Sequence, residues 1–166
     1  HGTDTLSYAS ATLARFLGQS AHVVMTGSQY PLLNISGTNT REFTDAIDNL
    51  NFALDAVATS SVGVYLAFHH QLIHAQTALK QHTTELDAFA GLNAQENLVT
   101  HQQSYVVHEH DIEKAQSFNC LSLMAQPIVI EQQIKNLKNL QQHPPHVLIL
   151  QGFGTGNLVV NEELIA

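Results

Sequence analysis

The chain has 166 residues, 44% of them hydrophobic and 12% charged, a composition that is typical of a globular protein and excludes a disordered one. Its net charge is −8, and the six Lys and Arg residues form no run, so we expect no nucleic-acid partner. No apolar run reaches the roughly 18–20 residues of a membrane span, and the single Cys120 excludes an intrachain disulfide, so we expect a protein of a reducing compartment with no membrane partner.

The first predicted elements are a helix and a short strand. Residues 5–17 predict a helix that ends at Gly18, because its larger apolar residues recur at helical spacing. These are Leu6, Ala9, Leu13, Phe16 and Leu17. The β-branched run at 22–27 then predicts a buried strand that ends in a glycine turn.

A long polar loop, residues 28–43, separates this strand from the next helix. Thr44 is a predicted N-cap, and the helix that follows carries an apolar stripe, which we expect to face the core. The stripe consists of Ile47, Leu50, Leu54 and Val57. Residues 62–69 predict another buried strand, and this alternation of strands and helices predicts an α/β fold with a parallel sheet covered by helices.

The second half of the chain predicts a new domain. Residues 1–97 are assigned to part of an N-terminal Rossmann- or flavodoxin-like catalytic domain that we expect to lack its first strands, and the polar residues 98–118 to a linker with at most one strand pair. Residues 119–166 predict the beginning of a smaller C-terminal α/β domain. Its predicted elements are a strand at 120–124, a helix at 131–141 and a strand at 146–151.

Eleven His residues raise the question of a metal site. His69, His70 and His74 are clustered, but their spacing lacks the Glu of a zinc-protease helix, and no cysteine stands near them. We interpret them as surface and loop residues and expect no metal, with a structural metal as the alternative. The stretch GFGTGN has G-x-G-x-G spacing, which favours a tight turn over a dinucleotide site, so no cofactor is expected.

The opening residues HGTDT form a candidate active site at the carboxyl edge of the sheet, where ligands of α/β proteins bind. Gly2 lets the backbone approach a ligand, and Thr3 and Asp4 supply a hydroxyl and a carboxylate. A threonine hydroxyl needs a base, and a desolvated lysine can act as one. Lys80 follows the strand 62–69, so Thr3, Asp4 and Lys80 can meet within about 6 Å. The alternative is that Thr3 and Asp4 only cap the helix.

Several longer motifs accompany HGTDT. They are VVMTGSQYP (23–31), TDAIDNL (44–50), Lys80 followed by LDAFAGLN (86–93), and LILQGFGTGN (148–157). Together they resemble the asparaginase/glutaminase family, and specifically its type I, cytoplasmic branch. The resemblance covers essentially the whole chain, although Ala46 replaces a glycine of the family's Ser-Asp-Gly-x-x-Asn-Leu motif.

The resemblance implies roles for individual residues. Lys80 would be the base, Thr3 would relay the proton or be activated, and Asp4 would orient Lys80 and bind the substrate's amino group. Ser28 matches a pocket position that contacts the leaving amide through its backbone. Asn157 matches a residue that reaches the neighbouring subunit's site, which implies a homodimer or tetramer.

The implied reaction converts L-asparagine and water into L-aspartate and ammonia through an acyl-enzyme, in the cytoplasm and without a metal or cofactor. The alternatives are a glutaminase or a tRNA-amidotransferase subunit of the same fold and, in another class, a non-catalytic α/β binding module. The family's usual nucleophile is the first Thr of a Thr-Gly-Gly-Thr turn, which is not in the sequence. We therefore expect an internal fragment that is inactive by itself.

Overall fold

The computed structural model describes residues 1–92, 98, 106–124 and 130–154. The chain divides into two compact units, residues 1–106 and 107–166. The division predicted from the sequence, with a linker at 98–118, stays a prediction. Helix α3 (Glu109–Ser117) lies inside this stretch, where the sequence indicated at most a strand pair.

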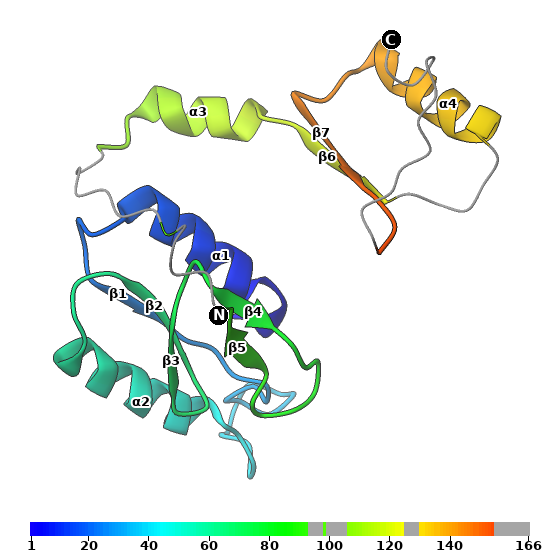
Figure 1. The fold of residues 1–166 in the computed structure, drawn as a ribbon. Helices are drawn as coiled ribbons and strands as arrows, with labels where there is room; N and C mark the ends of the chain where they lie inside the picture. Colours follow the sequence, from blue (N-terminus) through cyan, green and yellow to red (C-terminus); the bar gives the residue numbers. More distant parts are fainter. Residues whose placement is uncertain (93–97, 99–105, 125–129, 155–166) are drawn as a thin grey trace. The chain divides into compact units, whose positions relative to one another are not determined.

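The first unit is a helix-covered sheet (Figure 1). Helix α1 (Thr3–Leu17) is followed by β1 (Val23–Met25), α2 (Ala46–Thr59) and β2 (Val64–Phe68). Strands β1 and β2 are parallel, and α1 and α2 lie on opposite sides of them. The α/β class and the parallel pairing predicted from the sequence are therefore confirmed.

Three further short strands make the first unit more antiparallel than the sequence indicated. Strand β3 (Gln71–His74) pairs antiparallel with β2, and β4 (Ala78–Lys80) pairs antiparallel with β5 (Phe89–Gly91). Two residues, His69 and His70, join β2 to β3, with φ angles of 45° and 57°. Positive φ at both central residues is the conformation of a type I′ hairpin turn. The residues most often found in such a turn are Asn-Gly.

The clustered histidines thus belong to this hairpin. His69 and His70 form its turn, and His74 ends β3 opposite Tyr65. Burial lowers the pKa of His74, because desolvation disfavours the charged ring. Within the described ranges, no three His, Cys, Asp or Glu side chains are grouped so that they could hold a metal ion.

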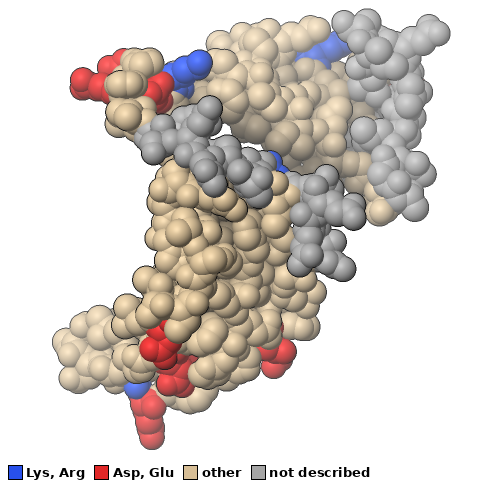
Figure 2. Space-filling view, turned by 60° about the vertical axis from the view of Figure 1, so that its left-hand side comes forward, with Lys and Arg blue, Asp and Glu red and all other residues tan. Residues whose placement is uncertain are grey.

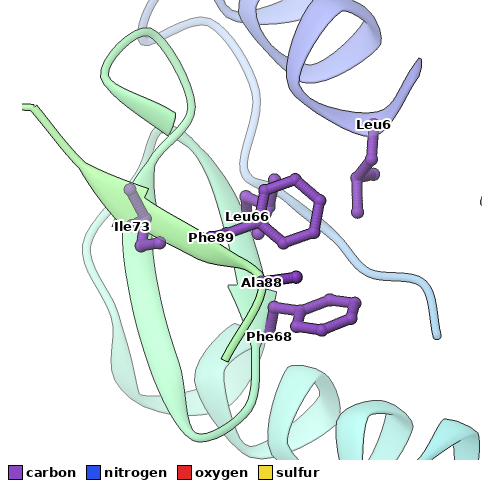
Figure 3. Packing of buried hydrophobic residues seen from close by; sticks show 6 residues of the cluster. All are labelled: Leu6, Leu66, Phe68, Ile73, Ala88 and Phe89. Atoms are coloured by element: carbon purple, nitrogen blue, oxygen red, sulfur yellow. The ribbon is translucent and has the colours of Figure 1, made fainter. Parts of the chain in front are cut away.

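The core of the first unit joins α1 to the sheet (Figure 3). The rings of Phe68 and Phe89 meet edge to face, with centroids 4.9 Å apart, and Leu6 is fully buried in the same cluster. This edge-to-face contact stabilises the cluster beyond the contribution of the apolar area that it buries. The cluster consists of Leu6, Leu66, Phe68, Ile73, Ala88 and Phe89.

Helix α2 packs through a different face from the one predicted. The predicted stripe, which includes Ile47 and Leu54, is 46–61% exposed. The buried residues of α2 are Asn49, Ala53 and Ala56. Small alanine side chains bring the helix close to β1 and β2, a position that the larger side chains would prevent. The prediction was wrong because hydrophobic spacing takes no account of how near two backbones must come.

The second unit contains a β-α-β arrangement. Strands β6 (Cys120–Met124) and β7 (Val147–Gln151) are parallel, with Cys120 opposite Val147. Helix α4 (Ile130–Lys138), extended by a 3₁₀ turn (Asn139–Gln142), lies between them in sequence, as predicted. Cys120 is a free, exposed thiol.

Charged side chains are sparse on the surface. On the face in Figure 2, uncharged residues make most of the visible area, and the Lys and Arg side chains are scattered. Among the described helices, none has the length and apolar character needed to cross a membrane.

The two helix faces give a direct test of the packing. Leu6→Ala removes a fully buried side chain and is expected to lower the free energy of unfolding by about 2–5 kcal/mol. Leu54→Ala, at a position that is 61% exposed, is the matched control and is expected to change it by less than about 0.5 kcal/mol. Urea denaturation measures both. Equal losses would contradict the assignment of the buried faces.

Candidate active site

Residues Thr3 and Asp4 form the first turn of α1. The N-cap of this helix is Gly2, in an extended conformation and with no side-chain capping bond. The Thr3 and Asp4 side chains are instead hydrogen-bonded outside the helix, to Lys80 in both cases. The alternative that these two residues serve only as helix caps is therefore not what the structure shows.

Lys80 brings these side chains together. Its Nζ lies 2.8 Å from Oγ1 of Thr3 and 2.7 Å from Oδ1 of Asp4, well inside the 6 Å range expected from the sequence. The Lys80 side chain is 18% exposed and that of Asp4 is 89% exposed. A cation that is mostly withdrawn from water thus contacts one hydroxyl and one carboxylate at the surface. The catalytic roles of the three residues stay a prediction.

The position of Lys80 depends on the hairpins that the sequence did not indicate. Lys80 does not directly follow the strand that ends near residue 69. The chain first returns along β3 and then turns at Thr77, whose N–H donates to the carbonyl of His74. Lys80 is the last residue of β4, where it pairs with Phe89 of β5. Because Phe89 is part of the buried core, this pairing fixes the backbone of Lys80.

Two further predicted site residues lie beside the start of α1. Gly2 and Ser28 form a parallel bridge, and the main-chain nitrogen of His1 donates to the carbonyl of Thr26 at 3.2 Å. A Cβ on Gly27 would collide with the carbonyl oxygen of His1, so this close approach requires glycine. Gly2, Thr3, Asp4, Ser28 and Lys80 thus share one region, whereas Asn157 lies outside the described residues.

A groove of about 380 Å³ opens beside Lys80, between α1 and β4. This volume is within the range of small-molecule sites. Lys80 and the single carboxylate of Asp4 do not form a metal ligand set. The Thr3 hydroxyl beside the Lys80 nitrogen is instead suited to proton transfer. The groove is lined by Asp4, Ser7, Tyr8, Ala11, Ala78, Leu79, Lys80, Gln81, His82 and Thr83.

Sequence reasoning missed three polar residues behind the site. Gln29 Oε1 accepts a hydrogen bond from the Thr3 hydroxyl at 3.1 Å. Asp45, the N-cap of α2, and Asn49, within α2, are buried and bind the backbone of the segment that contains Gln29. The sequence showed their motifs, TGSQ and TDAIDNL, only as part of the family resemblance. It did not indicate that Asp45 and Asn49 are buried, because α2 was expected to bury its large apolar side chains instead.

Comparisons with known proteins agree on one family. The family model described as "Asparaginase, N-terminal" matches residues 1–113. An L-asparaginase of Thermococcus kodakarensis is 34% identical over 94 residues, which are 56% of this chain and 26% of that protein. A glutamyl-tRNA(Gln) amidotransferase subunit from Nanoarchaeum equitans is 33% identical over 101 residues, or 56% of this chain and 24% of that protein. The chain matches about a quarter of the length of these curated relatives.

Solved structures share the fold over nearly the whole chain. A probable cytoplasmic L-asparaginase from Campylobacter jejuni has a TM-score of 0.67 at 20% identity, covering 98% of this chain and 55% of that chain. The thermostable L-asparaginase from Thermococcus kodakarensis has a TM-score of 0.65 at 23% identity, covering 98% and 49%. At these identities the likeness concerns the fold alone.

The contact at Gly27 can be tested by stability. Gly27→Ala places a methyl group against the His1 carbonyl and is expected to cost on the order of 1–3 kcal/mol of unfolding free energy, as overpacking does. Gly2→Ala is the control, because nothing lies within 4 Å of a Cβ at that position. Chemical denaturation of both variants measures the difference. Unchanged stability of Gly27→Ala would mean that His1 does not lie against Gly27.

Proposed function

The chain belongs to the asparaginase family, and on this premise we propose that the protein is an amidohydrolase that converts L-asparagine and water into L-aspartate and ammonia. The observation that carries the proposal is the contact of Nζ of Lys80 with both Thr3 and Asp4, at 2.8 and 2.7 Å. A lysine held against a hydroxyl and a carboxylate is the arrangement that base-assisted attack on an amide needs.

In the proposed reaction a threonine hydroxyl attacks the side-chain amide carbon of the substrate. The C–N bond breaks, ammonia leaves with the proton delivered to its nitrogen, and an acyl-enzyme ester remains, which water then cleaves to aspartate. The attacking threonine gives its proton to Thr3, the proton of Thr3 passes to Lys80 as the base, and Lys80 returns a proton to the departing nitrogen. Family resemblance assigns the attack to the first Thr of a Thr-Gly-Gly-Thr turn. No metal or cofactor takes part.

Substrate binding involves the remaining residues of the site. The Asp4 carboxylate is 89% exposed, so it is open to the substrate's ammonium group while its Oδ1 holds Lys80. Gly2 and Ser28 lie side by side and offer backbone groups to the amide end. Asn157 is proposed to reach the site of a neighbouring subunit, which makes the protein a homo-oligomer, and we propose a cytoplasmic location.

A second candidate function has specific support. The similarity to the amidotransferase protein of Nanoarchaeum equitans, 33% identity over 101 residues, nearly equals the similarity to an L-asparaginase. In this role the protein would release ammonia for transfer to glutamyl-tRNA(Gln) rather than into solution, and glutamine is a further possible substrate. The same Thr3, Asp4 and Lys80 would serve either reaction.

Substrate choice separates these functions. We expect the full-length protein, without glutamyl-tRNA(Gln), to release ammonia from L-asparagine at least about tenfold faster, in kcat/KM, than from L-glutamine, a difference that one extra methylene in a fitted site can produce. A coupled ammonia assay measures both rates. Amide transfer that requires glutamyl-tRNA(Gln) would support the amidotransferase instead, and binding without hydrolysis of either amide would support the non-catalytic module.

The role of Lys80 has its own test. Lys80→Met keeps most of the apolar stem but removes the base, so kcat is expected to fall by about 10²–10⁴-fold at unchanged thermal stability. Lys114→Met, on the exposed face of α3, is the control and should leave kcat unchanged. Steady-state ammonia release measures both variants. Near-normal turnover by Lys80→Met would assign Lys80 to a structural ion pair.

A further inference from the structure

Two buried polar side chains, those of Asp45 at the N-cap of α2 and of Asn49 within α2, have no part in the proposed reaction. Asp45 is 9% exposed and Asn49 is 3% exposed, in a unit whose buried residues are mostly apolar. A buried carboxylate is costly unless it is well hydrogen-bonded. Their partners therefore indicate what these two residues hold in place.

Apart from the hydrogen bond between Asp45 and Asn49, these partners come from the loops that follow β1 and β2. The Asp45 carboxylate accepts the backbone N–H groups of Gln29 (2.9 Å) and Tyr30 (2.8 Å), together with the Asn49 side-chain amide (2.9 Å). The same amide donates to the carbonyl of Gly27 (3.0 Å), and its oxygen accepts the N–H of His69 (2.9 Å). Asp45 and Asn49 thus clamp segment 27–30 to the end of β2.

Gln29 connects this clamp to the active site. Its Nε2 donates to two backbone carbonyls, those of Thr83 at 3.0 Å and Glu85 at 2.8 Å. Because a nitrogen must face those two acceptors, the orientation of the amide is fixed and Oε1 faces Thr3. The Thr3 hydroxyl then donates to Gln29 at 3.1 Å and accepts from Lys80 at 2.8 Å.

We propose that Gln29 is a positioning residue for Thr3, and that Asp45 and Asn49 act through Gln29. Gln29 holds the Thr3 oxygen where it faces Lys80, so the hydroxyl proton reaches Lys80 by rotation about the C–O bond, without movement of the oxygen. Gln29 also links the start of α1 to the segment after β4, through Thr83 and Glu85. This inference rests on the proposed amidohydrolase function.

The experiment compares two variants and their double mutant in the full-length protein. Gln29→Met preserves side-chain length but removes both polar atoms, and with them the hydrogen bonds to Thr3, Thr83 and Glu85. It is expected to lower kcat about tenfold while KM changes less than about threefold, since the hydrogen bond that orients Thr3 is lost. Asn49→Ala should lower kcat similarly. If Asn49 acts through Gln29, adding Asn49→Ala to Gln29→Met costs little more, so the two effects are not additive.

Matched controls come from the same elements or from the same residue type. Asn51→Ala removes an exposed amide from α2, and Gln71→Met changes an exposed glutamine of β3. Both should leave kcat and KM unchanged. Thermal unfolding of every variant separates loss of stability from loss of positioning. If Asn49→Ala does not fold, Gln29→Met still decides, because Gln29 is only half-buried and belongs to no core cluster.

The possible outcomes lead to distinct conclusions. An active parent protein with normal kcat in Gln29→Met overturns the positioning role alone. Additive effects of the two substitutions overturn the link through Gln29. A parent protein that releases no ammonia from either amide overturns the proposed function, and the catalytic meaning of the clamp with it. A lowered kcat, a nearly constant KM and non-additive effects support the proposal.

Discussion

The burial of Leu6 is the constraint on which the candidate site depends. Residues three and four apart share a face of a helix, so a helix that buries Leu6 also turns Thr3 toward the sheet. The fully buried Ser10 and the nearly buried Ala14 continue the same face along α1. Apolar packing in the middle of the helix thus aims the first-turn hydroxyl at Lys80, whose own backbone is paired with the core residue Phe89. The packing of the core therefore determines the geometry of the site.

Much of this organisation could be predicted from the sequence. The α/β class, the family and the convergence of Thr3 and Asp4 with Lys80 follow from periodicity, strand order and motif resemblance. The strands β3 to β5 could not be predicted, since three or four residues carry little pattern and the His69-His70 turn lacks the usual Asn-Gly signal. Asn157 lies outside the described residues, so its role was not tested.

The orientation of α2 illustrates a different limit of sequence reasoning. Amphipathic spacing favours the face with the largest apolar side chains, but α2 buries Asn49, Ala53 and Ala56, and its N-cap residue Asp45 is buried as well. A buried carboxylate is tolerated there because backbone N–H groups and an amide occupy both of its oxygens. The backbone N–H groups that need a buried carboxylate as acceptor are determined by the geometry of the loop. A local sequence pattern does not specify that geometry.

The charges at the site argue for a role other than stability. The Asp4 side chain is 89% exposed, and an ion pair open to water on one side contributes about 0–1 kcal/mol. The Lys80 side chain is 18% exposed, and its Nζ is hydrogen-bonded to Thr3 and to Asp4 in place of part of its hydration. The backbone of Lys80 is already paired with Phe89, so these two contacts orient the side chain rather than hold the strand. A lysine nitrogen oriented toward a hydroxyl and an exposed carboxylate is what the proposed base needs, and the proposed function therefore accounts for this arrangement better than stability does.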